Sequence, residues 1–284
     1  MQPDRLKGKE MPKAFCDIRL IASDMDGTLL TDEHRITPLA KAAIARIWER
    51  GTHFCLCSGR VPASMRPYVE EIGTETPYIA GNGTSIIDAK THKAIWSHML
   101  SAQLARAVLA LSEEMGVYAH TYTNDDFIYP YECAEAENYK ASCGLSGKCA
   151  GALSKSIDFD VPKVIFICEP KKALEVRDRV LERFSGNVEC VLSQPNFAEI
   201  IPKGASKGAA LKRLCDMMNI PMRTVMAFGD GQNDVSMLRA CGISVAPDDA
   251  QSYAKDTADF ICPRHGDDGV AKFITSHILR GESE

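Results

Sequence analysis

The sequence lacks long apolar stretches, because most of its apolar runs are shorter than about ten residues and a membrane-spanning helix needs about 20. Its first residues, MQPDRLKGKEMPKAFCDIR, lack the apolar centre of a signal peptide. It also lacks a basic excess, since 33 Lys and Arg stand against 38 Asp and Glu, a formal net charge of −5. General nucleic-acid binders need a basic surface to face phosphates. We therefore expect a cytoplasmic protein with no membrane or nucleic-acid partner and no evident obligate protein partner.

The sequence contains no C-x-x-C pair, although it has 11 cysteines in 284 residues. Cys55 and Cys57 are the one close couple, and no neighbouring cysteine and histidine complete a zinc site around them. Secreted domains of this size do not usually carry scattered free thiols along their strands. We interpret the cysteines as reduced residues that pack in the core as small hydrophobic side chains.

What the sequence does contain is the composition of a folded protein, with 45% hydrophobic and 25% charged residues. Strand-like apolar runs alternate with helical patterns near both ends of the chain. The predicted strands are 18–23, 53–57, 78–80, 224–228, 243–246 and 259–261. One predicted helix begins at Pro38 after the N-cap Thr37 and has Leu39, Ala43, Ile44 and Ile47 on one face. A second follows Arg60 and ends near Gly73, and a third begins at the cap Ser206 and reaches about Asn219. Two more are predicted at about 234–240 and from Val270 onward. This alternation predicts an α/β fold with a Rossmann-like parallel sheet between helices.

The middle of the chain differs in texture from both ends. Short strands are predicted at 85–88, 94–97, 118–122, 163–168 and 188–192, and helices at about 101–115 and 170–184. The stretch 132–160 is polar and poorly periodic. We therefore expect an N-terminal extension (1–17), a core formed by 18–84 and 199–284, and a large inserted α+β unit (85–198).

Polar residues follow several of the predicted core strands. Because ligands of open parallel sheets bind beyond the carboxyl ends of the strands, these residues are expected to meet in one pocket. The carboxylates of Asp24, Asp26 and Asp230 would repel one another there without a cation, and hard oxygen ligands favour Mg²⁺ over zinc. Lys207 begins a helix, where a bound anion such as phosphate would explain a cation. The residues in question are Asp24, Asp26, Ser58, Gly59, Arg60, Asn82, Asp230, Asn233 and Asp234.

Four of these segments resemble the motifs of the haloacid dehalogenase-like superfamily. Asp24-Met25-Asp26-Gly27-Thr28-Leu29 resembles its nucleophile motif, Ser58-Gly59-Arg60 its second, Lys207-Gly208 its third and Gly229-Asp230-Gly231-Gln232-Asn233-Asp234 its fourth. The order, the spacing and the insert between the second and third motifs resemble the Cof-like sugar-phosphatase branch. The resemblance covers about residues 18–278, and all four motifs in order make it highly specific.

The resemblance implies a Mg²⁺-dependent phosphatase of small phosphomonoesters, such as sugar phosphates, whose insert is a substrate-specificity cap. Asp24 would be the nucleophile that becomes an aspartyl-phosphate, and Asp26 the general acid and base, a role that suits a raised pKa. The phosphate would be held by Ser58, Gly59, Lys207 and Asn233, and the metal by Asp24, Asp230 and the backbone carbonyl of Asp26. Supporting roles are expected for Asp234, Thr28 and Arg60, although Arg60 is equally well interpreted as an ion-pair partner.

The sequence departs from the branch at one place and leaves alternatives open. The branch commonly has Asn where this chain has Asp249, so the pocket is expected to be more negative. His120 and Tyr122 share one face of a cap strand, where they could contact substrate or belong to an ordinary half-exposed strand. A mutase similar to phosphomannomutases and an inactive phosphosugar-binding regulator remain as alternative functions. Loss of Asp24, Asp26 or Lys207 would indicate the inactive regulator, and all three are present.

Overall fold

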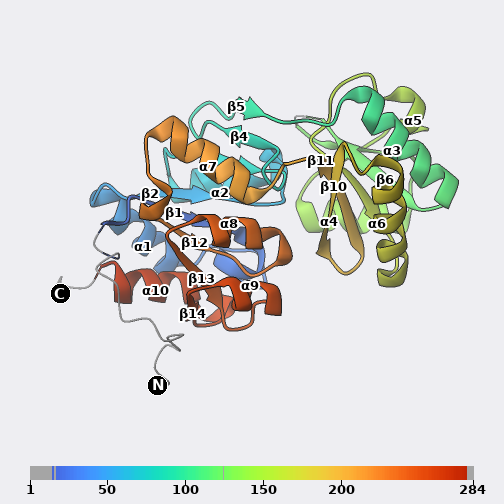
Figure 1. Cartoon of the computed structure of the whole chain (residues 1–284). Coiled ribbons are helices and arrows are strands. Elements are labelled where there is room, and N and C mark those ends of the chain that lie inside the picture. The colour runs from blue at the N-terminus through green and yellow to red at the C-terminus, as the bar shows by residue number, and fades with distance from the viewer. Residues whose placement is uncertain (1–14, 16, 124, 280–284) are drawn as a thin grey trace.

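The computed structural model describes residues 15, 17–123 and 125–279 and shows two parts side by side (Figure 1). The predicted N-terminal extension therefore lies almost wholly outside the described residues. The core part contains a parallel five-stranded sheet in the order β14-β13-β12-β1-β2. Its strands are β1 (Leu20–Ser23), β2 (His53–Leu56), β12 (Val225–Phe228), β13 (Ile243–Pro247) and β14 (Phe260–Cys262).

Alternating side chains of these strands form two apolar layers, one on each face of the sheet. Ile21 belongs to the layer under the first helix group, and its neighbours Leu20 and Ala22 to the layer under the second. The first group is α1 (Pro38–Glu49), α2 (Pro62–Ile72) and α10 (Gly269–His277), and the second is α7 (Lys207–Met218), α8 (Val235–Ala240) and α9 (Ser252–Thr257). The predicted α/β sandwich is confirmed.

The N-cap residues in the sequence correctly predicted where the core helices α1 and α7 begin. Thr37 and Ser206 cap α1 and α7, and each side-chain oxygen accepts a hydrogen bond from the backbone amide three residues on, at 3.1 Å. Leu39, which was predicted on one face with Ala43, Ile44 and Ile47, is 43% exposed, and Ala40 joins the other three on the buried face. Cys55 and Cys57 are free thiols in the core with their sulfurs 3.7 Å apart, as expected.

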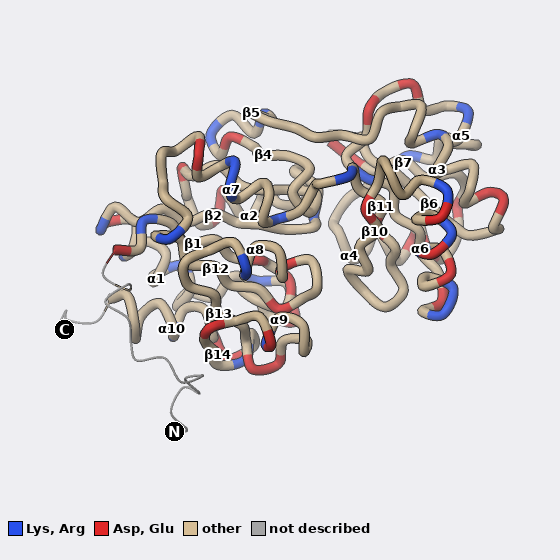
Figure 2. The backbone as a smooth tube through the Cα atoms, in the orientation of Figure 1, with Lys and Arg blue, Asp and Glu red and all other residues tan. Residues whose placement is uncertain are grey.

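The second part is a cap built on a six-stranded sheet in the order β10-β11-β9-β6-β7-β8. Its outer face packs on α3 (Ala102–Met115), α5 (Leu153–Ser156) and α6 (Pro170–Phe184), and its inner face on α4 (Ala134–Cys143). Basic and acidic positions alternate along α6 (Figure 2). The strands are β6 (Tyr118–Tyr122), β7 (Phe127–Tyr129), β8 (Lys148–Cys149), β9 (Val164–Ile167), β10 (Val188–Gln194) and β11 (Phe197–Pro202).

Five cap elements were not predicted, namely β7, β8, β11, α4 and α5. The helix α4 buries only Ala136 among its ten residues, so it has no apolar periodicity to detect. Tyr139 of α4 instead packs against the inner cap cluster through aromatic contacts. Among the described residues, no helix has the length and apolar character needed to cross a membrane.

Strand pairing bears on where the insert begins and ends. β4 (Ser85–Ile87) pairs with β3 (Tyr78–Ala80) on one side and with β5 (Ala94–Ser97) on the other. A parallel bridge between Cys57 and Ile79 attaches β3 to the core. β11 pairs with β9 and β10 in the cap sheet. The predicted boundary at 84/85 separates β4 from its partner β3, and the boundary at 198/199 lies inside β11. The sequence did not reveal this because it does not show which strands pair. We propose crossings near residues 98–100 and 203–206 instead.

Candidate active site

The predicted site residues follow neighbouring parallel strands, whose carboxyl ends lie at one edge of the core sheet. Asp24 directly follows β1, whereas Ser58 and Asp230 are each the second residue after β2 and β12. This edge faces the cap, and a cavity of about 240 Å³ lies between the two parts. Its lining includes seven of the predicted residues: Asp24, Asp26, Ser58, Gly59, Arg60, Asp230 and Asn233.

Lys207 is fully buried immediately behind the cavity, at the first residue of α7. Its ammonium group donates to Asp24 Oδ1 at 2.5 Å and to Asp234 Oδ1 at 2.6 Å. The other oxygen of Asp234 accepts from the backbone amides of Asp230 and Gly231 at 3.0 and 2.9 Å. Asp234 therefore fixes Lys207 and the loop after β12, and Lys207 fixes the carboxylate of Asp24.

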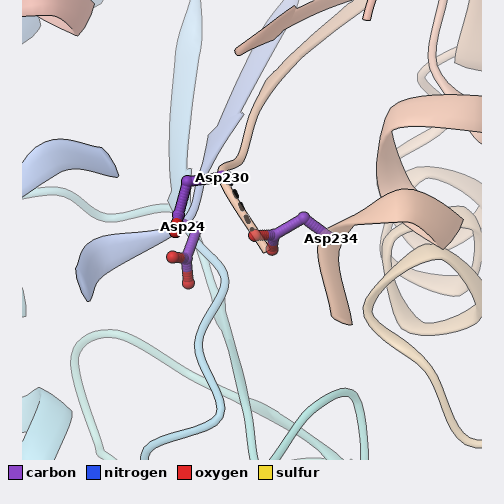
Figure 3. Close-up of side chains that lie close together, drawn as sticks. All are labelled: Asp24, Asp230 and Asp234. Atoms are coloured by element: carbon purple, nitrogen blue, oxygen red, sulfur yellow. Dashed lines mark hydrogen bonds between the residues drawn. The ribbon is translucent and has the colours of Figure 1, made fainter. Parts of the chain in front are cut away.

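A cluster of three carboxylates lies at the same edge (Figure 3). One oxygen from each of Asp24, Asp230 and Asp234 lies within 4.8 Å of the others. Because both oxygens of Asp234 already accept hydrogen bonds, Asp24 and Asp230 are the members better suited to bind a cation. Thr28 donates to Asp230 Oδ1 at 2.8 Å and orients it. Gly27, at φ +77°, allows this approach, since a Cβ there would lie 2.7 Å from Asp230 Oδ2.

The electrostatics of this cluster favour a bound cation. Burial and repulsion from Asp234 raise the pKa of Asp24 well above its usual range, although Lys207 opposes the shift. Burial and the Asp234 charge likewise raise the pKa of Asp230. Lys207 would lose its proton more easily through burial alone, but Asp234 and Asp24 raise its pKa above the usual lysine value. Lys207 thus provides one positive charge for three carboxylates, and a hard divalent cation would offset the remaining negative charge.

The pKa of Asp26 is shifted in the direction opposite to the prediction. Burial alone would raise its pKa, but Arg60 holds the pKa below its usual range. The guanidinium donates to both carboxylate oxygens, from Nε at 2.7 Å and from Nη2 at 2.6 Å. His34 lies 3.1 Å from the same carboxylate. The raised pKa that was expected for a general acid is therefore absent, and Arg60 is an ion-pair partner, one of its two predicted roles.

The cap contributes its own side of the cavity, through Tyr139, Ser142, Cys143, Lys163, Ile165, Ser193, Gln194, Phe197 and Glu199. His120 and Tyr122 do share a face of β6, where His120 Nε2 lies 3.1 Å from the Tyr122 hydroxyl, but both side chains are fully buried behind this lining. Burial and the Lys163 charge lower the pKa of His120 well below its usual value. Substrate contact by these two residues would therefore require the cap to rearrange.

Sequence reasoning did not single out Lys163 or Glu199. Each had a signal that could have been used, because Lys163 directly precedes the apolar strand β9 and Glu199 interrupts the apolar strand β11. A charge inside an apolar strand indicates a buried partner. The partner itself is not deducible, since the two residues are 36 positions apart.

Asp249 does not make the cavity more negative, contrary to expectation. Its carboxylate accepts from the backbone amide of His265 at 3.2 Å and lies 2.7 Å from His265 Nδ1. Arg264 lies 3.4 Å away, and Asp249 is absent from the residues that line the cavity. The Asp249 carboxylate therefore faces Arg264 and His265 rather than the cavity.

Comparison with known proteins agrees with this geometry. The family profile for haloacid dehalogenase-like hydrolases matches residues 21–274. A 5-amino-6-(5-phospho-D-ribitylamino)uracil phosphatase of Bacillus subtilis is 30% identical over 266 residues, covering 93% of this chain and 97% of the relative. A pyridoxal phosphate phosphatase of Escherichia coli is 27% identical and covers 92% of this chain and 99% of its own.

Solved structures show the same architecture, including the cap. A sugar phosphatase of haloacid dehalogenase subclass IIB superposes with a TM-score of 0.81 at 22% identity, over 91% of this chain and 98% of the other. The match extends across core and cap, so the likeness covers the fold of both parts. With its fold, its four motifs and its family match in agreement, this chain belongs to the haloacid dehalogenase-like hydrolases, in their Cof-like branch.

Proposed function

We propose that the protein is a Mg²⁺-dependent phosphatase that hydrolyses small phosphomonoesters through an aspartyl-phosphate on Asp24. The observation that carries this proposal is the contact at 2.5 Å between buried Lys207 and Asp24, which itself lines a cavity shared by core and cap. A lysine there holds the nucleophilic carboxylate in one orientation and offsets the charge of an incoming phosphate. The relatives named as phosphatases support the same reaction class.

The reaction would take place in two displacements, and Asp24 and Asp26 would act in both. An oxygen of Asp24 attacks phosphorus, and the leaving alkoxide departs with a proton from Asp26. Water then attacks the aspartyl-phosphate, gives its proton to Asp26, and releases phosphate and the free Asp24 carboxylate. Ser58, the Gly59 loop, Lys207 and Asn233 hold the phosphoryl oxygens.

Mg²⁺ fits the donor set of this site. Asp24 and Asp230 would hold it with the backbone carbonyl of Asp26, and when bound it would neutralise phosphoryl charge so that an anionic nucleophile can approach. Asp26 must leave the bidentate contact with Arg60 before it can carry a proton, because that contact stabilises its ionised form. We infer that substrate binding releases Asp26 from Arg60.

The cavity favours small substrates whose leaving group is uncharged. Its volume of about 240 Å³ is below the roughly 300–1,000 Å³ of typical drug-sized ligand pockets. Among the described cap residues that line the cavity, Lys163 is the one cation, and Glu199 already pairs with it at 2.8 Å. A mutase needs a second phosphate-binding group for its bisphosphate, so this lining favours hydrolysis over phosphoryl transfer within one sugar. Tyr139 and Phe197 offer aromatic surface for a sugar or heterocyclic ring.

A phosphate-release screen over phosphosugars, pyridoxal phosphate, nucleotides and p-nitrophenyl phosphate tests the proposal. We expect activity with Mg²⁺, none with EDTA, and poor activity with Ca²⁺, whose longer bonds and higher coordination number would engage both oxygens of Asp24.

The matched variants are Asp24→Asn and, as a control on an exposed cap residue, Asp158→Asn. Asp24→Asn should lose all but a few per cent of activity with an unchanged or higher melting temperature, because it relieves carboxylate repulsion. Retained activity in Asp24→Asn would overturn the assignment of the nucleophile. Phosphate binding with no turnover of any ester would favour the regulator instead.

A further inference from the structure

A buried ion pair lies in the cap sheet, directly against the core. Lys163, which precedes β9, is 2% exposed, and Glu199, on β11, is 4% exposed. Lys163 Nζ donates to Glu199 Oε2 at 2.8 Å, and Ser193 donates to the other carboxylate oxygen at 2.5 Å. Removing two charges from water is costly, so a buried pair with good geometry calls for an explanation beyond stability.

Both members of the pair also bond to core loops: Lys163 to the Gly59 loop, which was predicted to bind phosphate, and Glu199 to the Asn82 loop, which was predicted to lie in the same pocket. Lys163 Nζ donates to the backbone carbonyl of Gly59 at 2.7 Å, in the loop that carries Ser58. Glu199 Oε2 accepts from Asn82 Nδ2 at 2.8 Å. Asn82 Oδ1 in turn accepts from Asn233 Nδ2 at 3.0 Å. One cap ion pair is therefore connected to two separate loops of the core.

The chemistry of these groups fixes the orientation of both amides. A carboxylate can only accept hydrogen bonds, so the NH₂ group of Asn82 must face Glu199 and its oxygen faces Asn233. The NH₂ group of Asn233 must then face Asn82, which leaves its second N–H for a phosphoryl oxygen. Without Glu199, neither amide would have a preferred orientation from this network.

We propose that Lys163 and Glu199 are positioning residues that make the phosphate-binding geometry of the core depend on contact with the cap. The inference rests on the proposed function, because it assigns Gly59 and Asn233 to phosphate binding. Cap contact places Lys163 on the Gly59 loop and Glu199 on Asn82, and the two loops take up their binding conformation. Release of the cap frees both loops and weakens the hold on product phosphate.

The test replaces both charges together with side chains of similar length, in the variant Lys163→Met/Glu199→Met. Changing both residues avoids a lone buried charge, which would destabilise the fold for reasons unrelated to the proposal. The control is Arg183→Met/Glu114→Met, which removes an exposed ion pair of 2.7 Å between α6 and α3 on the outer side of the cap. The measurements are the melting temperature, kcat and KM for p-nitrophenyl phosphate, and the affinity for inorganic phosphate by calorimetry.

We expect the double variant to fold and to lose about 10- to 100-fold in kcat/KM, as expected for a lost charge-assisted hydrogen bond. The loss should appear mainly in KM, with phosphate affinity reduced by a similar factor, while the control matches the wild type. A double variant with wild-type KM and phosphate affinity would overturn the proposal. A purely structural role would lower the melting temperature without moving KM.

Hydrogen exchange of the unaltered protein gives a second test that does not depend on a variant folding. Saturating phosphate with Mg²⁺ should slow exchange in the core loops at 58–60 and 81–83 and also in cap residues 163–165 and 197–200. Protection confined to the core would overturn the proposal. If the unaltered protein binds phosphate but hydrolyses no ester, the proposed function fails while the coupling is still measured.

Discussion

At the scale of single residues, Lys207 shows how a buried charge can serve stability and reactivity together. Its ammonium group lies between Asp24 and Asp234, with no exposed surface and an acceptor on each side. Each carboxylate has a further task, Asp24 toward the cavity and Asp234 toward the loop after β12. Loss of the lysine would therefore leave two buried carboxylates close together without a cation.

Lys207→Met should lower the free energy of unfolding by about 3–5 kcal/mol, the usual effect of removing one partner of a buried ion pair. It should also abolish phosphatase activity. Urea denaturation near pH 7.5 measures the first effect. Lys212→Met, on an exposed position of the same helix, should change stability by less than about 0.5 kcal/mol. Equal stability of the two variants would show that Lys207 is not needed to balance the carboxylates.

His265 gives the site a neighbour whose charge depends on pH. Burial would lower its pKa, but hydrogen bonds with Asp32 and Asp249 raise it above the usual histidine value. The folded state therefore binds the proton more tightly than the unfolded state. The resulting stabilisation is complete below the unfolded pKa of about 6.5 and disappears as pH rises through the higher folded value.

His265→Gln should accordingly be destabilised more at pH 6 than at pH 8.5. The extra effect at the lower pH is expected to be roughly 0.5–1 kcal/mol, because partial exposure and solvent screen the pair. Denaturation curves of both proteins at the two pH values measure it. The opposite trend, with the larger difference at pH 8.5, would contradict the assigned ion pairs.

At the scale of elements, the loop between β3 and β4 shows how closely the chain segments of the site approach one another. Gly83 has φ +93°, and a Cβ there would lie 2.1 Å from the backbone carbonyl oxygen of Ser206, the N-cap of α7. A backbone atom cannot give way as a flexible side chain can. The glycine thus allows the Asn82 loop to lie directly against the start of the helix that carries Lys207.

Gly83→Ala should destabilise the protein by more than about 2 kcal/mol, because strain at positive φ is added to a backbone clash. Gly73→Ala is the matched control, since Gly73 also has positive φ (+64°) but nothing within 4 Å of its Cβ position. Gly73→Ala should lower the free energy of unfolding by about 1 kcal/mol. Thermal denaturation compares them, and equal losses would mean that the close approach to α7 is relaxed in solution.

At the scale of the whole molecule, the cap and core share the cavity, and the division between them bears on specificity. Core residues surround the expected phosphate position, whereas Tyr139, Phe197 and their neighbours surround the remaining volume. Val61 of the core packs within the inner cap cluster. The phosphate is thus expected to be recognised by the core and the rest of the substrate by the cap.

Replacing residues 99–203 by a short flexible linker should leave a core that hydrolyses p-nitrophenyl phosphate weakly. Its preference among phosphosugars should fall toward unity, because the cap side of the cavity is gone. Relative kcat/KM values for a panel of esters measure this, with circular dichroism to confirm folding. A folded truncation that kept the substrate ranking of the full chain would show that the cap does not determine specificity.

The sequence by itself determined the type of the core and the identity of the expected chemical groups. Strand and helix periodicities, the caps Thr37 and Ser206, and the polar residues after β1, β2 and β12 are local features, so they can be recognised without knowing the fold. Only the tertiary structure decided which distant residues meet. The pairing of Lys163 with Glu199, the hold of Arg60 on Asp26 and the membership of β4, β5 and β11 in their sheets all depend on long-range packing. Strand partners and buried charge partners are chosen by complementary surfaces far apart in the chain, and no local pattern in one sequence records that choice.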